Sequence, residues 1–207
     1  MAKSQKVAVL ASGGIDSSVL IHLLSKKYGE VFPVYVESGH IWERAELRAL
    51  KHYLKAVASK KLKPLSILSV PTQDLYWNHW SQTGKNTPDE RSRDEEVYLP
   101  GKNLLLISKA IVFCSLRGIS ELALGPLKTN PFPDASSQFF KKIAEAAGIA
   151  LNQKFWIHTP LLKYTKSEVV KLGKNLPLEL TFSCLNPKGN RHCRTCNKCA
   201  ERKNAFL

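Results

Sequence analysis

The sequence lacks any apolar run long enough to cross a membrane, and its longest stretches, such as Leu104 to Ile107, span only a few residues. It shows no internal repeat and no low-complexity tract, which excludes repeat arrays and fibrous chains. No apolar signal-peptide core with a cleavage site follows Met1, so we expect a cytoplasmic protein with no membrane partner. The 207 residues, 43% of them hydrophobic, fit one globular α/β domain with a small appendage.

Acidic residues are scarce. The chain has 17 Asp and Glu residues against 31 Lys and Arg residues, which gives a formal net charge of +14. Such an excess favours anionic partners, and we expect nucleotides, RNA or both. The alternative is a basic surface that is solvated and contacts no partner.

The cysteines are few and unevenly placed. Cys114 stands alone in an apolar segment, which predicts a buried thiol. The other four lie within the last 24 residues at short spacings: Cys184, Cys193, Cys196 and Cys199. Four thiolates spaced in this way predict a tetrahedral zinc site, with an iron–sulfur cluster as the alternative. Because four protein ligands leave no open position, we expect a structural site and a surface position for the neighbouring His192.

Short β-rich apolar segments alternate with segments of helical periodicity. We expect strands at 7–11, 31–36, 64–70, 122–124 and 155–159, and helices at 17–27, 42–60, 103–116, 139–147 and 167–174. This alternation predicts a doubly wound, mostly parallel, five-stranded Rossmann-like sheet. We expect an α/β domain at 1–180 and a cysteine-bearing element at 181–207. The polar, aperiodic segment 81–100 predicts a mobile lid, with a disordered excursion as the alternative.

The common nucleotide-binding loops are also missing, since neither the Walker spacing nor Gly-x-Gly-x-x-Gly occurs after a strand. Residues 12–17, Ser-Gly-Gly-Ile-Asp-Ser, instead join the first strand to the first helix. Glycines there allow close approach of a polyphosphate, and the helix N-terminus attracts its charge. We expect catalytic roles for Ser12, Asp16 and Ser17, with Asp16 bound to Mg²⁺. The same loop is expected to bind ATP through Ala11, Ser12, Gly13, Gly14, Asp16, Ser17 and Ser18.

This loop resembles the pyrophosphate-binding loop of the ATP pyrophosphatase superfamily, whose members split ATP into AMP and pyrophosphate while they adenylate a carbonyl oxygen. Nearly the whole chain resembles one branch of it, the 7-cyano-7-deazaguanine synthase family. The resemblance rests on the loop, the four cysteines and short motifs at 38–40, 46–47, 100–105, 132–134, 139–140, 159–161, 166–168 and 181–184. It implies an adenine nucleotide α-hydrolase-like fold, ATP, Mg²⁺ and Zn²⁺ as cofactors, and a homodimer.

The resemblance also implies a reaction and residue roles. The chain would adenylate 7-carboxy-7-deazaguanine and form the nitrile 7-cyano-7-deazaguanine with ammonia. Lys102 and Asn103 would line the nucleotide, and the substrate would contact His40, Gly101, Asp134, Thr181 and Arg202. Asp134 would pair with the guanine-like edge of the base. Alternatively, Asp134 caps the helix near Phe139, and Asn103 is the N-cap of its own helix.

The departures from the family pattern fall on the substrate side. Lys102 stands where the family usually has Arg, which differs in bidentate geometry. Residues 37–42 and 125–131 also differ from the usual motifs. A paralogue that adenylates another carboxylate and a tRNA-modifying adenylase of the same superfamily are therefore alternatives. A non-enzymatic zinc-ribbon module that binds RNA is a third, but it leaves the phosphate loop unexplained.

Overall fold

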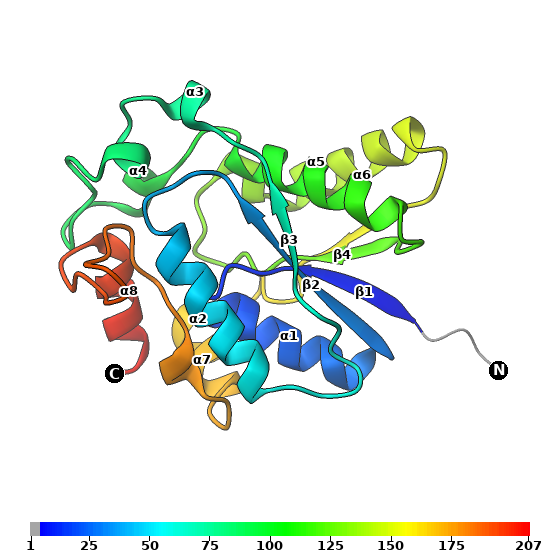
Figure 1. Ribbon diagram of the computed structural model, residues 1–207, viewed down its shortest axis with the longest axis horizontal. Helices are drawn as coiled ribbons and strands as arrows, with labels where there is room; N and C mark the ends of the chain where they lie inside the picture. The colour runs from blue at the N-terminus through cyan, green and yellow to red at the C-terminus, as the bar shows by residue number, and fades with distance from the viewer. Residues whose placement is uncertain (1–4) are drawn as a thin grey trace.

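Five parallel strands form the centre of the protein, in the order β3-β2-β1-β4-β5 (Figure 1). The computed structural model describes residues 5–207. The strands are β1 (Lys6–Leu10), β2 (Glu30–Glu37), β3 (Ser66–Ser69), β4 (Glu121–Ala123) and β5 (Trp156–His158). β1 is buried on both faces between β2 and β4, with Val7 opposite Val31 and Ala8 opposite Leu122. Its run of apolar residues without alternation fits this central position.

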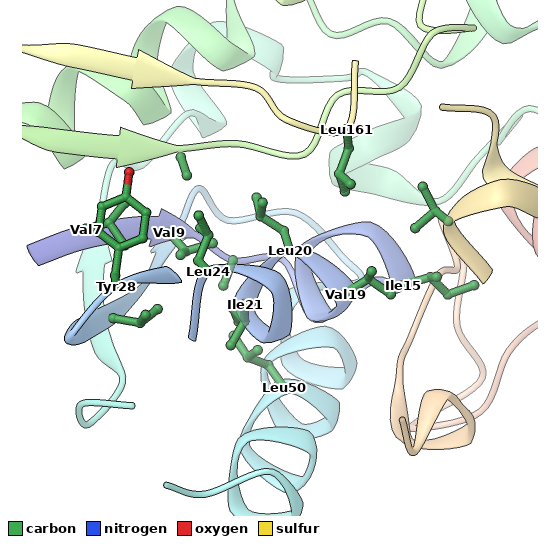
Figure 2. Close-up of a cluster of buried hydrophobic side chains, with 14 of the residues drawn as sticks. Val7, Val9, Ile15, Val19, Leu20, Ile21, Leu24, Tyr28, Leu50 and Leu161 are labelled. Carbon is green, nitrogen blue, oxygen red and sulfur yellow. The ribbon is translucent and has the colours of Figure 1, made fainter. Parts of the chain in front are cut away.

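Helices cover both faces of the sheet, which confirms the doubly wound prediction (Figure 1). One face packs against α1 (Ile15–Lys27), α2 (Glu43–Ala56) and α7 (Lys166–Leu172), and the other against α5 (Lys102–Ser115) and α6 (Ser137–Ala150). Figure 2 shows the first core, in which Leu50 of α2 lies beside Ile21 of α1. Cys114 is fully buried in the second core, as predicted.

Helix α2 ends at Ala56, earlier than the periodicity predicts. The reason is that the following segment must return to the sheet. The backbone N–H of Val31 donates to the carbonyl of Lys61, and that of Lys63 donates to the carbonyl of Val31. These contacts place residues 61–63 beside β2, where a longer α2 could not reach.

The polar segment 81–100 is not structureless. Two short helices, α3 (Gln73–Tyr76) and α4 (Trp80–Thr83), precede most of it, and a 3₁₀ turn, η1 (Asp94–Val97), lies near its end. The rest is fixed to the C-terminal element, where Asp89 forms an isolated bridge with Cys196 and Asn186 donates to the carbonyl of Gly84. Its mobility stays a prediction. No helix within residues 5–207 has the length and hydropathy of a membrane span.

The C-terminal element folds back against α2. The 3₁₀ turn η3 (Leu178–Leu180) comes just before this element, which contains the last helix, α8 (Asn197–Ala205). Phe182 and the cysteines form a small apolar cluster with Ala45 and Ala49 of α2. A third 3₁₀ turn, η2 (Pro133–Ala135), precedes α6.

Candidate functional site

A pocket of about 390 Å³ opens at the carboxyl ends of β1, β2 and β4. Leu10 is the last residue of β1 and Ala11 follows it. Tyr35 and Val36 belong to β2, and Leu124 follows β4. This is the edge at which doubly wound sheets bind ligands. Its size lies in the range of small-molecule sites. The pocket contains most of the predicted site residues: Ala11, Ser12, Gly14, Asp16, Ser17, Lys102, Asn103 and Asp134.

The predicted phosphate loop forms one end of this pocket. Ser12 and Ser17 brace the loop, because the Ser12 N–H donates to Ser17 Oγ at 3.2 Å and that hydroxyl lies 3.2 Å from the carbonyl of Gly14. Gly14 is the N-cap of α1 and provides no side-chain cap, which leaves the helix N-terminus suited to an anion. Gly13 has φ +77°, and a Cβ there would lie 2.8 Å from the carbonyl oxygen of Glu46. Only glycine fits this position.

A chain of charged side chains extends from the loop to the C-terminal element. Lys166 Nζ lies 2.5 Å from Asp16 Oδ2 and 3.6 Å from Glu201 Oε1. Lys198 Nζ lies 3.0 Å from Glu201 Oε2 and 4.0 Å from Asp94 Oδ1. All five residues line the pocket. Burial opposes protonation of Lys166, but the carboxylates of Asp16 and Glu201 outweigh it and raise the pKa of this lysine, so it stays cationic.

The loop end of the pocket fits a metal-bound polyphosphate. The second carboxylate oxygen of Asp16, Oδ1, is buried and has no hydrogen-bond partner among the described residues. Such an oxygen suits Mg²⁺, which prefers one or two carboxylates together with phosphate oxygens. Lys166 and Lys198 add two cations beside it. The predicted ATP and Mg²⁺ site is therefore chemically consistent with the residues present.

Aromatic rings form the other end of the pocket. Trp42 and Trp80 lie with ring centroids 5.7 Å apart, and Tyr98 stacks on Phe132 at 5.1 Å. Lys102 Nζ lies 5.0 Å from the centroid of the Trp42 ring. Flat apolar surfaces with a few polar groups suit a planar heterocycle. The sequence analysis missed these rings because residues 42, 80, 98 and 132 come together only in the fold.

Asp134 caps a helix, but a different one from the helix that the sequence suggests. Its Oδ2 accepts the backbone N–H of Asn103 at 2.9 Å, and its Oδ1 lies 3.3 Å from Asn103 Nδ2. It therefore binds the N-terminus of α5, while Ser136 caps α6 through the N–H of Phe139. Asn103 is not an N-cap either, because Gly101 takes that position with φ +75°. Asp134 still lines the pocket, and its contact with a base stays a prediction.

Six of the residues predicted to bind nucleotide or substrate lie outside the pocket lining: Gly13, Ser18, His40, Gly101, Thr181 and Arg202. His40 stacks on Trp42 at 4.6 Å, and burial lowers its pKa to about 3, so it is neutral. Arg202 donates to Thr181 Oγ1 at 2.7 Å and to the carbonyl of Leu178 at 2.8 Å, which ties α8 to η3. His40, Thr181 and Arg202 therefore do not line the pocket themselves and are bonded to or stacked on neighbouring residues.

Glu46 is a half-buried acid that lines the pocket and that belongs to the motif at 46–47, to which the sequence assigned no role. Burial raises its pKa from 4.5 to about 7, against the pull of Lys102, and its Oε2 accepts the Tyr35 hydroxyl at 2.8 Å. Glu43 beside it is satisfied by the backbone N–H groups of Ser38 and Gly39. A carboxyl group that titrates near neutrality beside a ligand pocket can move a proton during a reaction.

The variant Glu46→Gln tests this titration through stability. The folded protein keeps a proton on Glu46 that the unfolded chain releases above pH 4.5, so the free energy of unfolding should fall as pH rises from 4.5 to about 7. Between pH 5 and pH 8, wild type should lose on the order of 2 kcal/mol more than Glu46→Gln in urea unfolding. The exposed Glu179→Gln is the control and should follow wild type. Equal pH dependence in Glu46→Gln and wild type would refute the raised pKa.

The four clustered cysteines form a candidate metal centre. Their sulfur atoms all lie within 4.8 Å of one another, as one tetrahedral ion requires. Backbone N–H groups of Leu185 and Cys193 donate to the sulfurs of Cys196 and Cys184 at 3.4 and 3.3 Å, which stabilises negative sulfur. A hydrogen bond from Cys184 lowers the pKa of Cys196. The residues fit a structural zinc ion with four thiolate ligands.

His192 lies beside the cluster but is not a surface residue. It is half-buried, stacks on Phe182 at 4.4 Å, and its Nε2 accepts the N–H of Ser183 at 3.1 Å. Phe182 in turn donates its backbone N–H to the carbonyl of Gly13. His192 therefore stabilises the segment around Phe182 and Ser183, which connects the cysteines to the phosphate loop.

Asn197 joins the metal centre to the wall of the pocket. Its Nδ2 donates to the carbonyl of Ser92 at 2.9 Å and lies 3.3 Å from Asp94 Oδ1, while its backbone N–H donates to Pro88. The segment it holds leads directly to Val97, Tyr98 and Leu99, which line the pocket. Asn197 follows the ligand Cys196, so the metal centre determines where this wall lies.

Asn197→Ala should loosen this wall without loss of the metal. We expect faster hydrogen exchange in residues 84–97, and a KM raised about threefold to tenfold for a substrate that binds against this wall, because two partly buried hydrogen bonds are lost at roughly 1 kcal/mol each. Asn204→Ala, an exposed change on the same helix, is the matched control. Unchanged exchange in residues 84–97 would show that Asn197 does not position the segment.

Comparison with known proteins places the chain in a family. The family model described as "Queuosine biosynthesis protein QueC" matches residues 6–207. A relative from Desulfitobacterium hafniense, named 7-cyano-7-deazaguanine synthase 1, is 32% identical over 97% of this chain and 91% of its own length. A 7-cyano-7-deazaguanine synthase from Thermoplasma volcanium is 28% identical over 98% of this chain and 87% of its own.

Solved structures agree on the fold. A predicted tRNA methyltransferase subunit from Methanocaldococcus jannaschii is similar with a TM-score of 0.51 and 17% identity, over 82% of this chain and 76% of its own. A 4-thiouridine synthetase, solved with RNA and ATP, gives a TM-score of 0.50 and 18% identity over 98% of this chain and 50% of its own. These likenesses confirm the predicted adenine nucleotide α-hydrolase-like architecture. The family match along residues 6–207, together with the phosphate loop and the four cysteines, shows that the chain belongs to the QueC family of queuosine biosynthesis proteins.

Proposed function

We propose that this protein is an ATP-dependent ligase that converts 7-carboxy-7-deazaguanine and ammonia into 7-cyano-7-deazaguanine. The observation that carries the proposal is the pocket itself, which has a phosphate loop with Asp16 and Lys166 at one end and an aromatic slot at the other. A nucleotide and a planar acid bound in these two places would meet between them. The names of the family relatives agree with this assignment.

The reaction has two similar halves. In the first, a carboxylate oxygen of the acid attacks the α-phosphorus of ATP, pyrophosphate leaves, and ammonia then displaces AMP to give an amide. In the second, the amide oxygen attacks another ATP, pyrophosphate leaves again, and loss of both protons from the amide nitrogen with departure of AMP leaves the nitrile. Each nitrile therefore costs two ATP. The protein contributes mainly orientation and neutralisation of charge.

The residues divide between these tasks. Ser12, Ser17 and the start of α1 hold the phosphates, and Lys166 neutralises the departing pyrophosphate. Mg²⁺, held by Asp16, supplies further neutralisation when bound. Lys102 and Asn103 line the pocket beside the aromatic rings, where Lys102 would face the carboxylate of the acid. Glu46, with its pKa near 7, is placed to accept a proton that the amide nitrogen loses as the nitrile forms.

We also propose that residues 1–180 form the adenylating domain and residues 181–207 a zinc element that stabilises it. A homodimer is part of the proposal. Apolar side chains at one helical spacing along α5 support it, since Leu104, Val112 and Leu116 are all exposed. Light scattering of the purified protein should give a mass of about twice the 23.2 kDa of one chain.

A substrate panel separates this proposal from a paralogue that uses another acid. Metal-loaded protein is mixed with ATP, Mg²⁺, ammonia and one acid at a time, and AMP is measured. AMP should form with 7-carboxy-7-deazaguanine and not with 7-deazaguanine, which lacks the carboxylate. AMP formation with a different acid alone would replace the substrate but keep the reaction class. Formation only with tRNA present would favour the tRNA-modifying alternative.

A further inference from the structure

The outer face of α2 carries a row of cations that the proposed reaction does not use. Positions 44, 48, 51, 52 and 55 fall on one side of this helix, and all five side chains there are basic and exposed: Arg44, Arg48, Lys51, His52 and Lys55. Within residues 5–207, none of them lies within 4.0 Å of a carboxylate. We call this row the α2 stripe. Since no acid on the protein neutralises it, its charge is available to an external anion.

A surface hollow of about 660 Å³ runs beside the stripe. Arg44, Arg48, Lys51 and His52 form one wall, and Ser69, Pro71 and Gln73 at the end of edge strand β3 form the other. Leu47 also lines the hollow, as do two acids, Glu37 and Glu43, of which Glu43 is bonded to the backbone N–H groups of Ser38 and Gly39. The hollow therefore joins a cationic wall to apolar and hydrogen-bonding groups. A small inorganic anion would contact only the cationic wall.

An exposed aromatic ring stands one helical turn beyond the hollow. Trp77 follows α3, whose first residue is Gln73, and its side chain is 74% exposed. Its backbone has φ +26°, a strained value for a residue other than glycine. The fold thus exposes the Trp77 ring to solvent although its backbone conformation is strained. Basic grooves with nearby exposed rings are the arrangement that binds single-stranded nucleic acid, because rings stack on bases while cations follow the phosphates.

We propose that the α2 stripe and the adjoining hollow bind a single-stranded segment of RNA. The stripe from Arg44 to Lys55 is about 16 Å long at 1.5 Å per residue, which matches roughly five phosphates of a stacked strand. Glu37 would repel a phosphate but can accept a hydrogen bond from a ribose 2′-hydroxyl, the group that distinguishes RNA from DNA. The phosphates therefore lie on the stripe and the sugars face the hollow. This site lies outside the adenylation pocket and does not depend on the proposed ligase activity.

The test is fluorescence anisotropy with a labelled 12-nucleotide RNA, U12, and the full chain between 50 and 300 mM salt. The slope of log K against log salt should be about −2.8, because the stripe offers two Arg and two Lys side chains to the phosphates of a single strand. In Arg48→Gln/Lys51→Gln the slope should become shallower by about 1.4, and affinity at low salt should fall about tenfold or more. Trp77→Ala should weaken binding about fivefold or more with the slope unchanged, because stacking releases no counterions.

The control is Lys109→Gln/Lys141→Gln, which removes the same charge from exposed positions on α5 and α6, on the other face of the sheet (Figure 1). It should leave the affinity within about twofold of wild type. If it weakens binding as much as the α2 variant, the attraction comes from net charge and the proposed site is wrong. Equal affinity for the DNA strand dT12, for double-stranded RNA or for a polyglutamate peptide would also overturn the assignment to single-stranded RNA.

Discussion

Asp16→Asn should lower kcat/KM for ATP-dependent AMP formation by about 10²–10³-fold, the usual loss when one charged stabilising group is removed. The substitution keeps the shape of the side chain and removes its negative charge. It replaces one of the two carboxylate oxygens by an NH2 group, so it weakens both the ligand offered to Mg²⁺ and the ion pair with Lys166, whose Nζ lies 2.5 Å from Asp16 Oδ2. Lys166 keeps Glu201 as a partner at 3.6 Å, so we expect the fold to persist. The measurement is pyrophosphate release at saturating acid substrate.

The exposed Asp74→Asn is the matched control for this change and should retain full activity. Circular dichroism and thermal unfolding of both variants establish that the fold is intact. Titration with Mg²⁺ adds a second readout, because the Asp16 variant should require more Mg²⁺ for half-maximal rate. An Asp16→Asn protein with an unchanged rate and unchanged Mg²⁺ requirement would remove Asp16 from the site.

Cys196→Ser should release the metal and unfold the C-terminal element, with a loss of several kcal/mol, because binding of structural zinc is itself folding free energy. Cys196 is 2% exposed and belongs to the cluster that packs on Ala45 and Ala49. Its loss should also disturb the pocket through Asn197, which follows it. We expect less than one zinc per two chains by elemental analysis, a lower melting temperature, and rapid proteolysis after residue 180.

Cys114→Ala is the control for this second prediction, since Cys114 is fully buried but far from the cluster in the second core. It should keep one metal ion per chain despite some loss of core packing. The same elemental analysis identifies the metal and would reveal iron if the site held a cluster of iron and sulfur. A Cys196→Ser protein with one zinc ion per chain and an unchanged melting temperature would contradict the structural role.

Features encoded by neighbouring residues could be predicted from the sequence. The phosphate loop is six consecutive residues between a strand and a helix, and the structure brings Ser12, Asp16 and Ser17 to the pocket. The parallel sheet followed from apolar runs without alternation, as Val7 to Leu10 of β1 shows. The cysteine spacing likewise sufficed to bring four sulfur atoms together.

Features that depend on distant pairs were missed. The contact between Lys166 and Asp16 joins residues 150 positions apart, and the motif at 166–168 does not reveal which acid Lys166 contacts. Asp134 was predicted to contact the base or, alternatively, to cap the helix that follows it, but the fold places it against Asn103 at the start of α5. Arg202 seemed free to bind an anion, yet Thr181 and Leu178 take its hydrogen bonds. In each case the partner is set by packing between elements and not by sequence spacing.

The central claim is that the acid is activated by attack of its own oxygen on the α-phosphorus of ATP. The direct measurement uses 7-carboxy-7-deazaguanine labelled with ¹⁸O in both carboxylate oxygens, followed by mass spectrometry of the AMP. Our account predicts that each AMP carries one ¹⁸O and that two labelled AMP molecules form for each nitrile. Unlabelled AMP, or ADP and phosphate in its place, would contradict it.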